Sequence, residues 1–78
     1  MSISVNISKG STVIGKKVGA IEKDFKIKIK QLENFSDRIL PFPWEKLPHN
    51  KKIKEGDTLT VIGNDKEVIS FYKYATQN

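Results

Sequence analysis

Residues 55–63 read EGDTLTVIG, and this stretch contains the start, the body and the end of one strand. Gly56 and Asp57 favour a turn, because glycine takes a positive φ without strain and aspartate hydrogen-bonds its own backbone. Thr58 to Ile62 are β-branched or aliphatic, which is typical of a buried strand, and Gly63 ends the run. Residues 58–62 are therefore predicted to form a strand of the sheet.

A helix is predicted directly after this strand. Asn64 is a favoured N-cap residue, and Glu67 three places later completes a capping box. The residues that follow place apolar side chains at i, i+3, i+4 and i+7, which is one face of a helix. These residues are Val68, Phe71, Tyr72 and Ala75.

Residues 1–32 show three further patterns. Ile3, Val5 and Ile7 alternate with polar residues, as in a strand with one buried face. Helical spacing then predicts a short helix, whose apolar positions are Val18, Ile21 and Phe25. Gly19 lowers the stability of that helix by about 1 kcal/mol. A second strand is predicted where Phe25, Ile27 and Ile29 alternate with lysines, and Leu32 breaks its phase, so the strand bends or ends there.

A turn at residues 34–37 and a short strand at residues 38–42 come next. Pro41 confines this strand to an edge of the sheet, because proline cannot donate to a ladder. Residues 43–52 are predicted to be a loop. The expected order is strand, short helix, strand, strand, loop, strand, helix. We expect all strands to share one apolar interior that contains Val5, Ile29 and Val61.

The length and composition favour one small domain spanning residues 1–78. A chain of 78 residues buries only about 60% of its unfolded surface, so oligomerisation is a natural source of further stability. The chain has no Cys, which excludes a disulfide framework and a thiolate zinc site. No apolar run approaches the roughly 20 residues that span a bilayer, and the N-terminus has no signal-peptide layout. We expect a soluble, cytoplasmic protein.

The sequence contains no recognisable catalytic constellation. His49 is the only histidine, and without a second histidine or a cysteine nearby it is expected to be a solvent-exposed loop residue. Glu22 and Asp24 are two apart, so they would point to different sides of a helix. Glu55 and Asp57 are explained by the turn. We therefore expect no enzyme activity and no metal site.

The net charge of +5 lies in the first part of the chain, since residues 31–78 carry as many acidic as basic side chains. The lysines in question are Lys16, Lys17, Lys23, Lys26, Lys28 and Lys30. Such a basic surface can bind nucleic-acid phosphates, although no aromatic residue is interleaved on the lysine face for stacking. A solvated edge strand that resists aggregation explains the lysines as well.

The loop carries the most apolar irregular segment of the chain. Trp44 stands there with Phe42 and Leu47. Buried aromatics of this kind anchor partners or cover the core of their own fold. In a homodimer the two roles coincide, and Trp44 and Leu47 are predicted to lie at the interface.

Several pieces of the chain, in this order and spacing, resemble the TrkA-C, or RCK C-terminal, family. They read VIGKKV at residues 13–18, IE at 21–22, FKIKI at 25–29 and KEGDTLTVIG at 54–63, with Pro41 and Pro43 between them. The resemblance covers nearly the whole chain. It implies an α+β fold: a small pseudo-barrel of about four strands, with a short helix after the first strand and a C-terminal capping helix. It also implies a homodimer.

The resemblance further implies a regulatory, ligand-sensing module of potassium or other cation transport, acting with a Rossmann-type domain or a membrane transporter. Some members of the family bind a cyclic dinucleotide at the dimer interface. Mapped onto this chain, Asn34 and Arg38 would be polar contacts, and Pro41 and Phe42 the wall of the pocket. Asn34 stands where the family usually has Arg, so a phosphate site here would lack its bidentate donor and bind more weakly unless Arg38 replaces it.

Three functions are thus open to this sequence. The first is the regulatory binding module. The second is a small basic nucleic-acid-binding protein that uses the surface from Lys16 to Lys30. The third is a structural assembly domain without a ligand.

Overall fold

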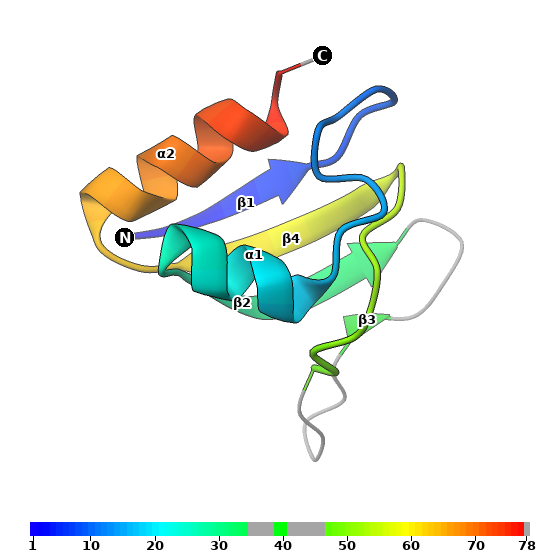
Figure 1. The fold of residues 1–78 in the computed structure, drawn as a ribbon, viewed down its shortest axis with the longest axis horizontal. Helices are drawn as coiled ribbons and strands as arrows, with labels where there is room; N and C mark the ends of the chain where they lie inside the picture. Colours follow the sequence, from blue (N-terminus) through cyan, green and yellow to red (C-terminus); the bar gives the residue numbers. More distant parts are fainter. Residues whose placement is uncertain (35–38, 41–46, 78) are drawn as a thin grey trace.

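The computed structural model describes residues 1–34, 39–40 and 47–77 of the 78-residue chain. The elements follow in the predicted order, as Figure 1 shows. They are β1 (Ser2–Asn6), α1 (Val18–Phe25), β2 (Lys28–Asn34), β3 (Ile39–Leu40), β4 (Asp57–Ile62) and α2 (Asp65–Ala75). The predicted α+β class is confirmed.

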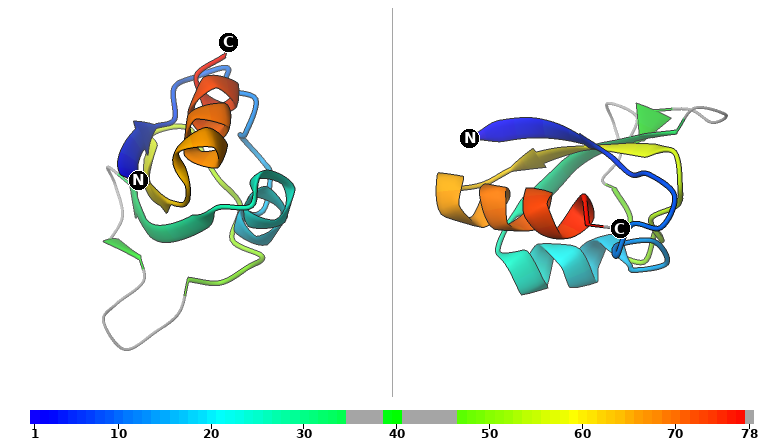
Figure 2. Two further views of the ribbon diagram at one scale, coloured as in Figure 1. Left: turned by 90° about the vertical axis from the view of Figure 1, so that its left-hand side faces the viewer. Right: turned by 90° about the horizontal axis from the view of Figure 1, so that it is seen from above.

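The four strands form one antiparallel sheet in the order β1-β4-β2-β3. The expected pseudo-barrel takes the form of this twisted sheet, and both helices lie over one of its faces (Figure 2). β4 is central, with Val61 opposite Ile3 on one side and opposite Ile29 on the other. Val5, Ile29 and Val61 are buried in the same core, as predicted, so the three strands share one interior.

β2 continues past the point where its apolar alternation changes phase. Its register against β4 shifts between Ile29 and Gln31, which leaves Lys30 as the extra residue of a bulge. Because of the bulge, Ile29, Leu32 and Asn34 all point to the buried face. The predicted bend at Leu32 is therefore a local insertion, and the strand does not end there.

Phe25 belongs to α1 and not to β2. Lys26 follows it with a φ of 56°, a left-handed conformation that ends the helix, and the strand begins only at Lys28. The ring of Phe25 lies edge to face with Phe71 at 5.4 Å and is 5.0 Å from the ring of Tyr74. The prediction that Phe25 opens the second strand was wrong, because a helical and an alternating pattern overlap at this residue.

Gly19 lies at the start of α1, where the chain crosses the loop that carries His49. Its N–H donates to the His49 carbonyl at 2.8 Å, and a Cβ at this position would stand 3.1 Å from the His49 Cβ and carbonyl oxygen. Glycine lowers the stability of the helix at this position. In return it lets the backbone of His49 approach closely enough for this hydrogen bond, which a larger residue would hinder.

α2 begins directly after Asn64, the predicted N-cap residue, and the half of the predicted capping box that Asn64 supplies is present. The side chain of Asn64 accepts a hydrogen bond from the Glu67 N–H at 2.9 Å. Val68, Phe71 and Ala75 are buried, but Tyr72 is 47% exposed. The inclusion of Tyr72 in the buried face was wrong: α2 covers the sheet with a narrower stripe, and Tyr72 lies at its border beside β1.

The C-terminal end of α2 is closed by the loop after β1. The Ser11 hydroxyl donates to the Ala75 carbonyl at 2.6 Å, and the Thr12 hydroxyl donates to the Tyr74 carbonyl at 2.5 Å. These bonds satisfy carbonyls that the helix itself leaves without partners. Within the described ranges, neither helix has the length and apolar character needed to cross a membrane.

Candidate functional site

The end of β2 is held to the turn before β4 by a buried polar contact. The Asn34 Nδ2 donates to the Asp57 Oδ1 at 2.5 Å, and the Lys54 N–H donates to the Asp57 Oδ2 at 2.8 Å. Asn34 is 9% exposed and Asp57 is fully buried. The turn role predicted for Asp57 is confirmed. The hydrogen bond between Asp57 and Asn34 was not predicted, because the two residues are 23 positions apart.

The turn itself is joined to the end of β1. Gly56 has a φ of 88°, and its N–H donates to the Ile7 carbonyl at 2.8 Å. The Ile7 N–H in turn donates to the Asp57 carbonyl at 2.8 Å. The Asn34 side chain is therefore bonded to a turn that is itself hydrogen-bonded to the end of β1. The end of β2, the turn before β4 and the end of β1 are joined at this point.

The predicted ligand site lies at the edge of the sheet formed by β2 and β3. Leu40 is opposite Leu32 and Ile39 is opposite Glu33, so β3 runs antiparallel beside the end of β2. The structure thus brings together the two elements that the sequence assigned to the ligand. Of the four predicted residues, Asn34 is described, and Arg38, Pro41 and Phe42 lie outside the described residues.

The predicted interface residues are described in part. Leu47 is half-buried and packs against the hydrophobic core, so it covers the protein's own interior. Trp44 lies outside the described residues. The proposed interface role of Trp44 stays a prediction.

The six lysines of the predicted basic surface are all exposed, but they lie on different elements. Lys28 projects from β2 on the face opposite the buried Ile29, and Lys23 lies in the last turn of α1. Lys16 and Lys17 precede α1 and lie beside residues 51–53, with Lys17 opposite Lys52. Sequence reasoning missed Lys51 and Lys52, since only the folded chain brings them to Lys17.

His49 is exposed, as predicted, with 86% of its side chain accessible. Its Nδ1 lies 3.7 Å from the Glu22 Oε1, while the Glu22 Oε2 accepts a hydrogen bond from the Ile29 N–H at 2.9 Å. Glu22 therefore ties α1 to β2. Among the residues that the structure describes, no group of three or more His, Asp and Glu side chains is placed to hold a metal ion.

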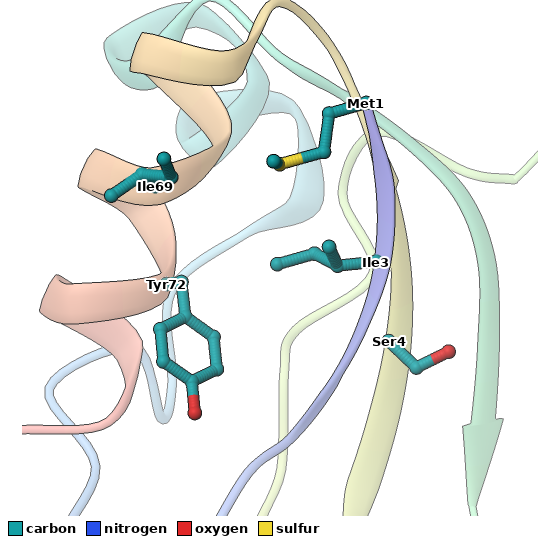
Figure 3. Close-up of a pocket in the computed structure, with 5 residues that line it drawn as sticks. All are labelled: Met1, Ile3, Ser4, Ile69 and Tyr72. Carbon is teal, nitrogen blue, oxygen red and sulfur yellow. The ribbon is translucent and has the colours of Figure 1, made fainter.

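An apolar groove lies at the opposite edge of the sheet, between β1 and α2 (Figure 3). Its volume is about 330 Å³, and Met1, Ile3, Ile69 and Tyr72 point into it, with Ser4 at its rim. β1 and β3 are the two edges of the sheet, so this groove is separate from the predicted ligand site. The sequence pattern had placed Tyr72 on the buried face of the helix, so this groove was not predicted.

The whole fold is similar to solved structures of RCK_C domains. The RCK_C domain dimer of S. agalactiae BusR in complex with c-di-AMP matches with a TM-score of 0.73 and 17% identity over 94% of this chain and 92% of that chain. S. agalactiae BusR in complex with its busAB-promotor DNA matches with the same score and identity, and this chain spans 34% of its length. No protein-family model and no curated protein matches the chain. The chain therefore has the RCK_C fold, as the resemblance implied.

Proposed function

We propose that this chain is a ligand-sensing and dimerisation module of the RCK C-terminal type, with a cyclic dinucleotide as its ligand. The observation that supports the proposal is the likeness of almost the entire chain to an RCK_C domain that was solved as a dimer with c-di-AMP. The ligand would lie between two copies, so that binding couples to association.

The proposed site is the β2–β3 edge. Asn34 and Arg38 are the proposed polar contacts, and Pro41 and Phe42 the proposed wall. A buried hydrogen bond to Asp57 fixes the orientation of Asn34, which reduces the conformational entropy lost on binding. Arg38 carries a guanidinium group, which suits bidentate recognition of phosphate oxygens.

The biological role proposed for the module is regulation of potassium or other cation transport in the cytoplasm, without catalysis. Its partners would be a Rossmann-type domain or a membrane transporter. A ligand that binds two copies at once can shift the relative positions of whatever each copy is attached to.

The ligand is tested by isothermal titration with c-di-AMP and related cyclic dinucleotides. We expect saturable binding at one ligand per two chains. Arg38→Ala is expected to weaken it by roughly 10- to 100-fold, because a hydrogen-bonded charge contributes about 1.5–3 kcal/mol. Lys66→Ala, which removes an exposed charge on α2, is the control and should bind as the parent does. Absence of heat with every cyclic dinucleotide would remove the sensing role.

Dimerisation is tested separately by sedimentation at micromolar protein. Trp44→Ala is expected to raise the dimer dissociation constant by at least about tenfold, since aromatic anchors dominate interface energetics. Tyr72→Ala removes an exposed aromatic ring at the other edge of the sheet and should leave the dimer unchanged. Unchanged sedimentation of Trp44→Ala would contradict the predicted interface.

A further inference from the structure

Two short segments that are distant in the sequence pair side by side, and we call them the lysine ribbon: residues 16–18 and 51–53. Lys17 and Lys52 are directly opposite each other in an isolated antiparallel bridge. Two backbone hydrogen bonds of 2.9 Å flank this bridge, from the Val18 N–H to the Lys51 carbonyl and from the Ile53 N–H to the Lys16 carbonyl. This pattern defines a non-hydrogen-bonded pair, in which opposite Cα atoms are only about 4.5 Å apart.

The two opposed side chains point away from the core. Val18 and Ile53, their neighbours in the ribbon, are buried. Because successive side chains alternate between faces, Lys17 and Lys52 project together from the other face, and both are exposed. Lys16 and Lys51 flank them in sequence, but the same alternation turns these two side chains to the opposite face, and Lys51 is only half-exposed. Lys17 and Lys52 are therefore the two charges that this face presents.

This arrangement has an electrostatic cost. Like charges directly opposite each other on paired strands are destabilising. In the part of the chain that the structure describes, no ion pair includes any of the ribbon's four lysines. An acidic residue at either position would remove the repulsion between Lys17 and Lys52. Because proteins keep such unfavourable pairs mainly at functional sites, we expect the two charges to serve a function.

The chemistry of the ribbon favours a polyanion over a single small anion. The N–H groups of Val18 and Gly19 donate to carbonyls of residues 51 and 49, so these donors at the start of α1 are already used. The ribbon then offers lysine ammonium groups, which are point charges without a fixed fork geometry. It also contains no aromatic side chain on which an unpaired base would stack.

We propose that the lysine ribbon is a docking surface for the backbone phosphates of duplex nucleic acid, independent of base sequence and independent of the cyclic-dinucleotide site. Each lysine that neutralises a phosphate releases condensed counterions, and affinity then falls steeply with salt. Contact of Lys17 and Lys52 with two phosphates corresponds to a slope of about −1.8 in log K against log salt concentration.

The test is fluorescence anisotropy of a labelled 20-base-pair duplex of arbitrary sequence, measured from low to moderate salt. Lys17→Ala/Lys52→Ala is expected to lower affinity at least about tenfold at low salt and to reduce the slope by about 2. The control Lys66→Ala/Lys73→Ala removes two exposed lysines of α2 and has the same net charge. It should remain within about twofold of the parent.

Three outcomes would overturn the proposal. The first is no binding of the parent chain to the duplex at low salt. The second is an equal loss in both double variants, which would reflect net charge alone. The third is capture of the parent by phosphatidylglycerol vesicles, but not by the duplex, in a manner sensitive to the ribbon.

A single charge reversal separates the fold from binding. Lys52→Glu replaces a repulsive pair with an attractive one, so the melting temperature is expected to rise by roughly 1–4 °C. Duplex affinity is expected to fall at least about tenfold in the same variant. A fall in both the melting temperature and the affinity would show that Lys17 and Lys52 stabilise the fold. That result would contradict the proposal.

Discussion

Replacement of Phe71 by alanine is expected to lower the free energy of unfolding by about 3–5 kcal/mol, the largest effect of any single change considered for this chain. Phe71 is fully buried, and it is the largest of the fully buried side chains among the described residues. It projects from α2 and meets Phe25 of α1 edge to face, so it joins both helices over the sheet. Truncation to alanine removes apolar atoms that folding buries away from water. It also leaves a cavity between the two helices and the sheet, which the surrounding structure fills only in part.

The measurement is urea unfolding followed by far-ultraviolet circular dichroism. Because a domain of this size has only about 5 kcal/mol in total, Phe71→Leu is made in parallel and should lose roughly half as much. Tyr72→Ala, at the adjacent but exposed position, is the control and should cost less than about 1 kcal/mol. Equal losses at positions 71 and 72 would contradict the observed orientation of α2.

Asp57→Ala is expected to lower the free energy of unfolding by about 3 kcal/mol. The carboxylate is fully buried and accepts hydrogen bonds from the Asn34 side chain and the Lys54 N–H. Its removal takes away the hydrogen bond from the buried Asn34 side chain and the part-buried hydrogen bond from the Lys54 N–H, and a hydrogen bond to a charged group contributes about 1.5–3 kcal/mol. The same change releases the end of β2 from the turn before β4.

Glu55→Ala is the matched control, since Glu55 belongs to the same turn but is exposed. It should change stability by no more than about 0.5 kcal/mol. Thermal and urea unfolding of the two variants give the comparison directly. A loss of less than about 1 kcal/mol in Asp57→Ala would mean that the buried contact contributes little, and the anchoring of Asn34 would have to be abandoned.

Local signals in the sequence were sufficient for most of the elements. Glycine and aspartate before a run of aliphatic residues placed β4, and Asn64 with Glu67 placed the start of α2. These signals work because a turn conformation and a helix cap depend on residues only a few positions apart. The overlap at Phe25 shows their limit, since one residue satisfied two periodicities and only packing against Phe71 decided between them.

The candidate site was less accessible to sequence reasoning. Asn34 was selected for its place at the end of the second strand, and the register of β2 against β4 shows that it lies opposite Asp57. No pattern within either segment specifies that pairing. Arg38, Pro41, Phe42 and Trp44 lie outside the described residues, and their roles rest on the proposed function.

The sequence by itself therefore determined the order of the elements, the start of the last helix and the inward positions of β1 and β4, because each depends on short-range geometry. Only the tertiary structure decided that Lys17 faces Lys52, that Asp57 holds Asn34, and that Gly19 admits the backbone of His49. These contacts join residues far apart in the chain. They form because burial of one shared core fixes the strand register and loop positions, which no local pattern encodes.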